Sequence, residues 1–151
     1  MAKLLMDEPE RVGRFVAERS PIERNPDFGK FSAIGVLRSD GKLVAGVVFS
    51  DWHPDSRRIE LSGAVDDPRV IGTQMIVAIG NYVFGQLNVH RCWAKTSTDN
   101  RRALKLLDGL GFIREGTLAG FYGPHRHALI MRVLEPEWRR KWGAIPLKKA
   151  A

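Results

Sequence analysis

The segment TSTDNRRALKLLDGLGFIREG, residues Thr96–Gly116, decides the fold class of this chain. It begins as the end of a strand, turns at Asp99 and Asn100, and continues with the apolar spacing of a short amphipathic helix. Gly111 ends that helix, because glycine readily adopts the left-handed conformation that closes helices. Asn100 therefore lies at a strand-to-helix turn, where it can cap the helix and can also serve a ligand.

The rest of the chain alternates between helix and strand signals. A first helix is expected from about Glu8 to Arg19, with Asp7 as its N-cap and Glu10 completing a capping box. A long helix is expected from about Pro68 to Leu87. Inward positions of the helix after Asn100 are Ala103, Leu106, Leu107 and Leu110. The expected strands cover residues 31–38, 42–52, 57–65, 90–97, 112–122 and 127–134, with a hairpin turn at Asp40-Gly41. This order predicts a mixed α/β sheet with helices on it.

The basic charge of the chain is concentrated at one end. The 151 residues carry a formal net charge of +7, which invites a nucleic-acid interpretation. More than half of that excess lies in the last residues, after Pro136. We therefore expect one domain over residues 1–138, followed by a basic tail over residues 139–151, and nucleic-acid binding is not the favoured function.

The chemistry-bearing residues also limit the class of protein. Cys92 is the one cysteine, so an internal disulfide is excluded, and the four histidines show no metal-ligand spacing. No apolar run reaches the roughly 18 residues of a membrane span. We expect a soluble cytoplasmic protein that holds no metal and does not enter membranes.

The segment DDPRVIGTQM, residues Asp66–Met75, indicates an anion site. Backbone amides at a helix N-terminus are unpaired and favour negative charge. Gly72 allows a phosphate to approach the backbone closely, and Arg69 adds a positive charge. An ordinary helix start would give the same pattern, so this segment alone does not decide between the two.

Several short motifs in order resemble the GNAT superfamily of N-acetyltransferases, and most of all its ribosomal-protein N-terminal acetyltransferase branch and small bacterial and phage members. RVIGTQ, residues 69–74, is similar to the superfamily's pyrophosphate loop, although Gln74 departs from the usual small residue. IELS, residues 59–62, resembles its Glu-bearing strand. The resemblance extends to Trp138. The matching residues of the second half are Asn100, Ala103, Gly111-Phe112, Glu115-Gly116, Gly123 and Glu137-Trp138.

The resemblance implies a fold and a co-substrate. The fold splays two parallel strands, here Arg58–Val65 and Arg91–Ser97, with helices on both faces and with a first strand that is short or missing. Acetyl-CoA would enter between these strands as an added strand along Ser62–Val65. Its implied contacts are Ala64, Val65, Arg69, Val70, Ile71, Gly72, Thr73, Gln74, Asn100 and Ala103.

The implied reaction is attack of a primary amine on a thioester in a ternary complex. Glu60 is the candidate general base, acting through water, and Ser62 is a second candidate catalytic residue. A backbone N–H near Val65 would serve the oxyanion. A structural salt bridge of Glu60 with Arg57, Arg58 or a neighbouring strand is the alternative.

This chain departs from its relatives at the proton donors. Leu107 and Ala103 stand where relatives carry hydroxyl side chains. Ser62, Tyr122 or water could protonate the departing thiolate instead.

The acceptor side is the least defined part of the sequence. Trp52, His53, Tyr122 and His127 are candidate substrate contacts. The acceptor is a small-molecule amine or a protein or peptide α-amine. A homodimer could complete this side, with Trp138 and Trp142 in the contact or else packed within their own chain.

Two other functions stay open. A protein of this fold could bind coenzyme A without efficient catalysis, which the missing hydroxyls favour. The basic tail could instead bind nucleic acid, and that binding would be salt-dependent and lost when the tail is removed.

Overall fold

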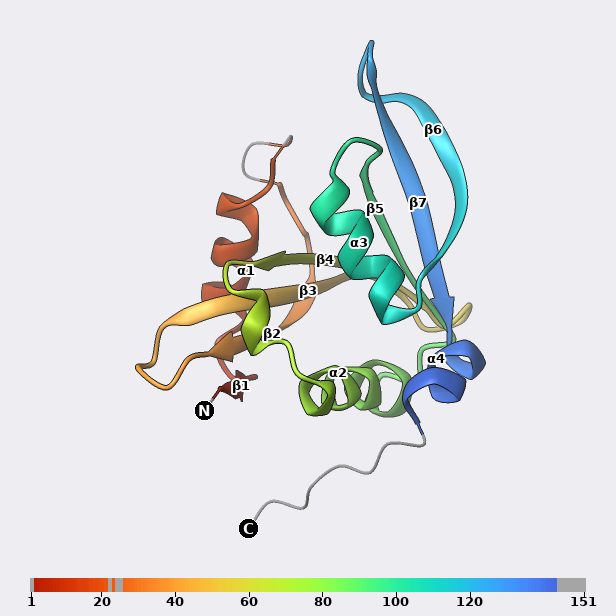
Figure 1. Ribbon diagram of the computed structural model, residues 1–151. Coiled ribbons are helices and arrows are strands. Elements are labelled where there is room, and N and C mark those ends of the chain that lie inside the picture. Colours follow the sequence, from red (N-terminus) through yellow and green to blue (C-terminus); the bar gives the residue numbers. More distant parts are fainter. Residues whose placement is uncertain (1, 22, 24–25, 144–151) are drawn as a thin grey trace.

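One seven-stranded mixed sheet organises the chain (Figure 1). The computed structural model describes residues 2–21, 23 and 26–143. The strand order is β1-β2-β3-β4-β5-β7-β6; the β4–β5 pairing is parallel and the other pairings are antiparallel. The strands are β1 (Lys3–Leu5), β2 (Phe31–Leu37), β3 (Leu43–His53), β4 (Arg58–Val65), β5 (Arg91–Ser97), β6 (Ile113–Gly123) and β7 (Arg126–Leu134).

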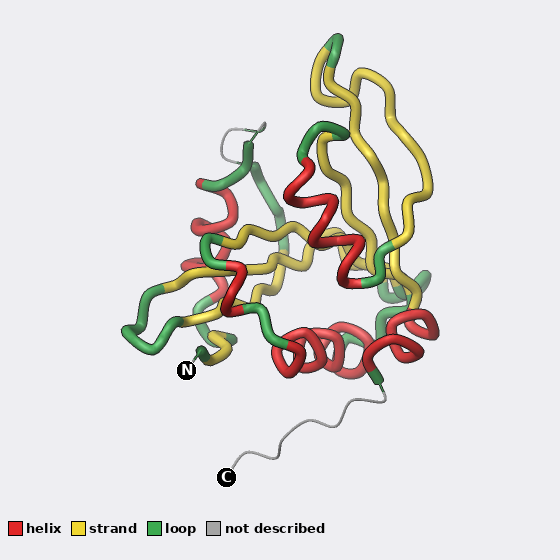
Figure 2. Tube along the Cα trace, viewed as in Figure 1, coloured by secondary structure: helices red, strands yellow, loops and turns green. Residues whose placement is uncertain are grey.

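Helices cover both faces of the sheet, as predicted. Helix α1 (Pro9–Glu18) packs against β2, β3 and β4 through Val12, Phe15 and Val16. On the other face, α2 (Thr73–Gly80), α3 (Arg101–Leu110) and α4 (Glu135–Trp142) enclose the larger core. The tube in Figure 2 shows that the β6–β7 hairpin extends beyond these helices.

The N-terminal region agrees with the predicted short first strand, since β1 has 3 residues. The predicted capping box is wrong: Glu8 is the N-cap of α1, and no side chain caps the helix. Pro9 at the first helical position needs no acceptor for a backbone N–H, which reduces the demand for a capping side chain. Arg19 lies over the Phe15 ring and donates two hydrogen bonds to Asp66, at 2.8 and 2.9 Å.

The prediction of one long helix from Pro68 to Leu87 is wrong, because the structure divides this segment into three helical pieces. A short 3₁₀ helix, η1 (Pro68–Val70), comes first, and α2 begins only after Gly72. Wider π-helical turns, η2 (Asn81–Gln86), then continue α2. The break before Thr73 leaves a separate helix N-terminus facing solvent.

One inward position of α3 is also wrong. Leu106 is 37% exposed, whereas Leu104 and Leu107 are buried in the core. Gly111 closes the helix in the left-handed conformation at φ 101°, as predicted.

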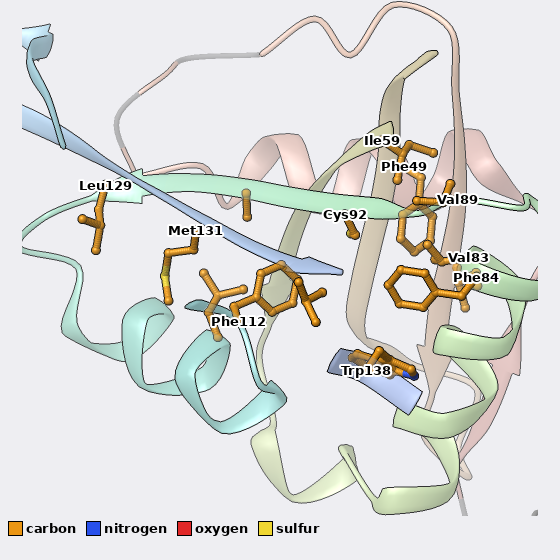
Figure 3. Packing of buried hydrophobic residues seen from close by; sticks show 14 of the residues in the cluster. Phe49, Ile59, Val83, Phe84, Val89, Cys92, Phe112, Leu129, Met131 and Trp138 are labelled. Carbon is orange, nitrogen blue, oxygen red and sulfur yellow. The ribbon is translucent and has the colours of Figure 1, made fainter. Parts of the chain in front are cut away.

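The tryptophans of α4 pack within their own chain. Trp138 is buried beside Phe84, with ring centroids 5.7 Å apart, and Figure 3 shows both in the core cluster. The Trp142 indole donates to the Leu110 carbonyl at 2.9 Å. A subunit contact through these two residues is therefore not supported. Helix α4 continues past the predicted domain boundary at Trp138, and residues 144–151 of the predicted tail lie outside the described residues.

Gly80 allows α2 to approach α4 closely. A Cβ at this position would clash with the Trp138 indole, whereas a Cβ at the exposed Gly109 would meet no atom within 4 Å. We expect Gly80→Ala to lower the free energy of unfolding by about 1–3 kcal/mol, because overpacking displaces core side chains. In Gly109→Ala, the same change within α3 should raise it by up to about 1 kcal/mol. Urea denaturation measures both, and equal stability of the two variants would contradict the close packing.

Candidate active site

Strands β4 and β5 separate partway along their length. The paired residues are Arg58 and Arg91, Ile59 and Cys92, and Glu60 and Trp93. After Glu60 the described strands form no further pairs with each other, while β4 stays paired with β3 up to Val65. Figure 1 shows the resulting divergence of β4 from β5. The predicted splayed pair is therefore present, and Glu60 lies at its vertex.

A pocket of about 540 Å³ lies at the N-terminus of α2. Gly72 caps this helix with extended backbone, and a Cβ there would meet no atom within 4 Å. The next two amides, of Thr73 and Gln74, have no acceptor among the described residues. Unpaired helix N-terminal amides favour an anion. The lining residues are Ala2, Arg38, Ser39, Arg69, Val70, Gly72, Thr73, Gln74 and Met75.

Not every backbone amide in the predicted phosphate-binding segment, residues 70–74, is free to bind a phosphate. The N–H groups of Val70, Ile71 and Gly72 donate to carbonyls within the same turn, at 3.3, 3.2 and 3.1 Å. The free donors at this turn are therefore those of Thr73 and Gln74.

Two arginines of the pocket are paired with aspartates. Arg38 donates to Asp40 at 2.6 and 3.2 Å, and Arg69 donates to Asp67 at 2.9 and 3.1 Å. The Arg38 hydrogen bond lowers the pKa of Asp40 to about 2, and the Arg69 hydrogen bond lowers the pKa of Asp67. Arg38 lies in the β2–β3 turn, and no local pattern in the sequence connects that turn with α2.

Asn100 caps α3, as its position in the sequence predicts. Its Oδ1 accepts a hydrogen bond from the Ala103 N–H at 3.2 Å. The amide NH₂ group of Asn100 has no acceptor among the described residues and stays available to a ligand. Asn100 can therefore serve the helix and a bound molecule together.

Arg102 joins α3 to the far end of β4. Its guanidinium donates to the Val65 carbonyl at 2.8 Å. In an antiparallel pair the N–H and C=O of one residue point to the same side, so both Val65 groups face away from β3 and toward the cleft. Ala64, the other predicted contact on this strand, lies opposite Gly46 of β3. The sequence did not single out Arg102.

At the vertex, Glu60 forms a salt bridge with Lys95 of β5. The Lys95 Nζ lies 2.7 Å from Glu60 Oε2, and the two side chains are 25% and 14% exposed respectively. The Lys95 ammonium also lies 5.3 Å from the Trp93 ring centroid and 5.8 Å from that of Phe121. A salt bridge from Glu60 to a neighbouring strand was one of the alternatives left open by the sequence. The alternation of β5 residues could have placed Trp93 and Lys95 on one face, opposite Cys92 and Ala94.

Tyr122 lies near the C-terminal end of β6, in edge contact with Phe121 at 5.0 Å between ring centroids. Burial, and then the negative charges of Glu23 and Glu60, raises the pKa of Tyr122 to about 12. The phenol is therefore protonated at neutral pH and can act as a proton donor.

Ser62 is the other predicted hydroxyl donor, and Leu107 and Ala103 are the positions at which relatives carry hydroxyl groups. Ser62 follows Glu60 by two residues on β4, so its side chain is on the same face. Leu107, at the position where relatives carry a tyrosine, is buried in the core and does not line the cleft. Neither it nor Ala103 offers a proton.

The other three predicted substrate residues lie on β3, for Trp52 and His53, and on β7, for His127. Trp52 is 51% exposed, and His53 Nε2 lies 2.9 Å from Asp51. The Nδ1 atom of His127 accepts a hydrogen bond from the Gly120 N–H at 2.8 Å within the β6–β7 hairpin. Their roles toward a substrate stay predictions.

Residues 2–21, 23 and 26–143 contain no group of three or more His, Cys, Asp or Glu side chains suited to a metal ion. Within the same residues, no helix has the length and apolar character needed to span a membrane.

No protein-family model and no curated protein sequence matches this chain. Solved structures do match. A mutant form of the spermidine/spermine N-acetyltransferase from Vibrio cholerae superposes with a TM-score of 0.74 at 16% identity, over 93% of this chain and 99% of that chain. The spermidine N-acetyltransferase from the same organism, in complex with CoA and spermine, gives a TM-score of 0.71 at 16% identity, over 91% and 97%. A third structure, with manganese ions, gives 0.71 at 18% identity, over 93% and 96%.

At these identities the likeness concerns the fold. It agrees with the order of the seven strands and the divergence of β4 from β5, and it extends over nearly the whole chain. The chain has the GNAT fold.

Proposed function

We propose that this protein is an N-acetyltransferase that moves an acetyl group from acetyl-CoA to a primary amine by direct attack in a ternary complex. One observation carries the proposal: strand β4 connects a partly buried carboxylate at the vertex, Glu60, with the anion pocket that follows its other end. Acyl transfer to an amine needs an anion site for the phosphates of the acyl-CoA and a base near its thioester, and these two groups lie at opposite ends of the pantetheine arm.

The co-substrate is proposed to span this distance. The Thr73 and Gln74 amides, with Arg69 and Arg38, would bind phosphates at the α2 end. The backbone of β4 would pair with the pantetheine arm, while the free amide group of Asn100 donates from the other side. Because Arg102 now occupies the Val65 carbonyl, it would have to release that carbonyl when the arm binds.

The proposed chemistry uses the groups at the vertex. Glu60 would take a proton from the acceptor amine, directly or through water, since only the neutral amine attacks a thioester. Tyr122 keeps its proton at neutral pH and is the proposed donor to the departing thiolate. Ser62, on the same face of β4, is the second candidate donor.

The acceptor is proposed to be a primary amine that binds as a cation before it reacts. The Glu60 carboxylate pairs with an ammonium that lies near two aromatic rings, and such a setting is favourable for a bound amine. The similar solved structures are named as spermidine and spermine N-acetyltransferases, which supports a small amine or polyamine. The resemblance of the motifs to the ribosomal-protein branch instead supports a peptide α-amine, and both belong in the test.

The test is acetyl-CoA turnover against a panel of polyamines, amino acids, small amines and peptides, followed by release of free thiol. We expect one class of amine to give turnover well above the rate of acetyl-CoA hydrolysis. The proposal fails if no amine in the panel is acetylated by protein that binds acetyl-CoA.

Binding without turnover would favour the second candidate, a coenzyme A-binding module. Two observations support that alternative. Leu107, at a position where relatives carry a hydroxyl, is an apolar core residue, and Glu60 already forms a salt bridge with Lys95. A cytoplasmic location and a homodimer stay predictions.

A further inference from the structure

The Lys95 ammonium occupies the position that an acceptor amine would need. It lies 2.7 Å from Glu60, the candidate base, at the vertex where β4 and β5 part. Two aromatic rings, those of Trp93 and Phe121, flank it. These are the features, a carboxylate and aromatic faces, that the proposed function assigns to acceptor recognition.

No other described lysine has this setting. Lys95 forms the one lysine salt bridge found among residues 2–21, 23 and 26–143. The remaining described lysines are exposed on the surface: Lys3, Lys30, Lys42, Lys105 and Lys141. Lys95 combines partial burial, a base within hydrogen-bond distance, and a place beside the opening between the strands.

We propose that Lys95 is an internal acetyl acceptor, and so a modification site, when acetyl-CoA is bound and no external amine occupies the vertex. This inference rests on the proposed function, because it uses the same thioester and the same base. It adds a specific substrate, a side chain of the protein itself.

The step balances with acetyl-CoA as the one co-reactant. Glu60 takes a proton from the Lys95 ammonium and passes it to solvent, which leaves a neutral amine with its lone pair free. The Nζ–C bond to the acetyl carbonyl carbon forms and the C–S bond breaks. The second nitrogen proton goes to the departing thiolate, so that the products are an N-acetyl-lysine, coenzyme A with a free thiol, and one proton.

The experiment incubates the full chain with acetyl-CoA alone and follows modification by intact mass and by peptide mapping. We expect Lys95 to be acetylated at least about ten-fold faster than the exposed Lys42 and Lys105, which report uncatalysed transfer. The rate constant should not depend on protein concentration, because the reaction is intramolecular. Lys95→Arg keeps a cation beside Glu60 and should lose the fast modification, and Glu60→Gln should slow it.

Parallel measurements separate this inference from the proposed function. If the protein acetylates an external amine while Lys95 reacts no faster than Lys42, the inference is overturned and the proposed function stands. A rate that rises with protein concentration also overturns it, because transfer would then occur between molecules. If acetyl-CoA does not bind at all, both fail.

Discussion

Gly72→Glu should weaken acetyl-CoA binding by at least about 100-fold, which corresponds to about 2.7 kcal/mol. Gly72 caps α2 beside the two free amides of Thr73 and Gln74, and its position is open to solvent. A glutamate there would place bulk and a negative charge where phosphates are expected, and like charges at close range cost several kcal/mol. Isothermal titration calorimetry with acetyl-CoA and with CoA measures the effect.

A matched variant separates the local effect from the added charge. Gly109→Glu makes the same substitution on the exposed surface of α3, where a Cβ also meets no atom within 4 Å. It should bind acetyl-CoA as the unmodified protein does. Arg38→Ala, which removes one cation from the lining of the pocket, should weaken binding by a smaller factor, roughly 5-fold. Equal affinity of Gly72→Glu and Gly109→Glu would show that the phosphate site is misplaced.

Glu60→Gln should lower kcat by about 10²–10⁴-fold, the usual contribution of a general base. The amide is close in size to the carboxylate, and its oxygen can still accept a hydrogen bond from Lys95, so the geometry at the vertex is preserved. Acetyl-CoA affinity should stay unchanged, because Glu60 lies at the opposite end of β4 from the anion pocket. Steady-state turnover with the best amine of the panel gives kcat.

Glu115→Gln is the control for the loss of an ion-paired carboxylate from the sheet. Glu115 lies on β6 and pairs with Arg91 and Arg132 instead of Lys95, and it accepts a hydrogen bond from Arg91 at 3.1 Å. This variant should keep kcat within about two-fold of the unmodified protein, although its stability falls by up to about 1 kcal/mol. Unchanged turnover in Glu60→Gln would exclude Glu60 as an essential base and leave its salt bridge as its role.

Much of the fold follows from local patterns. The alternation and turn residues predicted the strands, and Gly111 and Asn100 predicted both ends of α3, because caps and turns depend on backbone conformations that few residues favour. The prediction of a continuous helix from Pro68 to Leu87 is wrong because local spacing does not show where a helix is interrupted. Its apolar spacing was compatible with one long helix, but the chain breaks at Gly72 and widens after Gly80, where α2 packs on Trp138.

The sequence by itself determined the order of helices and strands, the glycine that precedes α2 and the asparagine that caps α3, because each of these depends on a few neighbouring residues. Its resemblance to the GNAT superfamily supplied the base candidate Glu60. The tertiary structure alone decided which side chains meet: Lys95 at Glu60, Arg38 at the α2 pocket and Arg102 at Val65. Each of these contacts joins segments more than 30 residues apart in the chain, since |i−j| is 35 for Lys95–Glu60 and 37 for Arg102–Val65. Such contacts depend on the register of the strands and on how the helices pack against the sheet, and no pattern within a few residues predicts them.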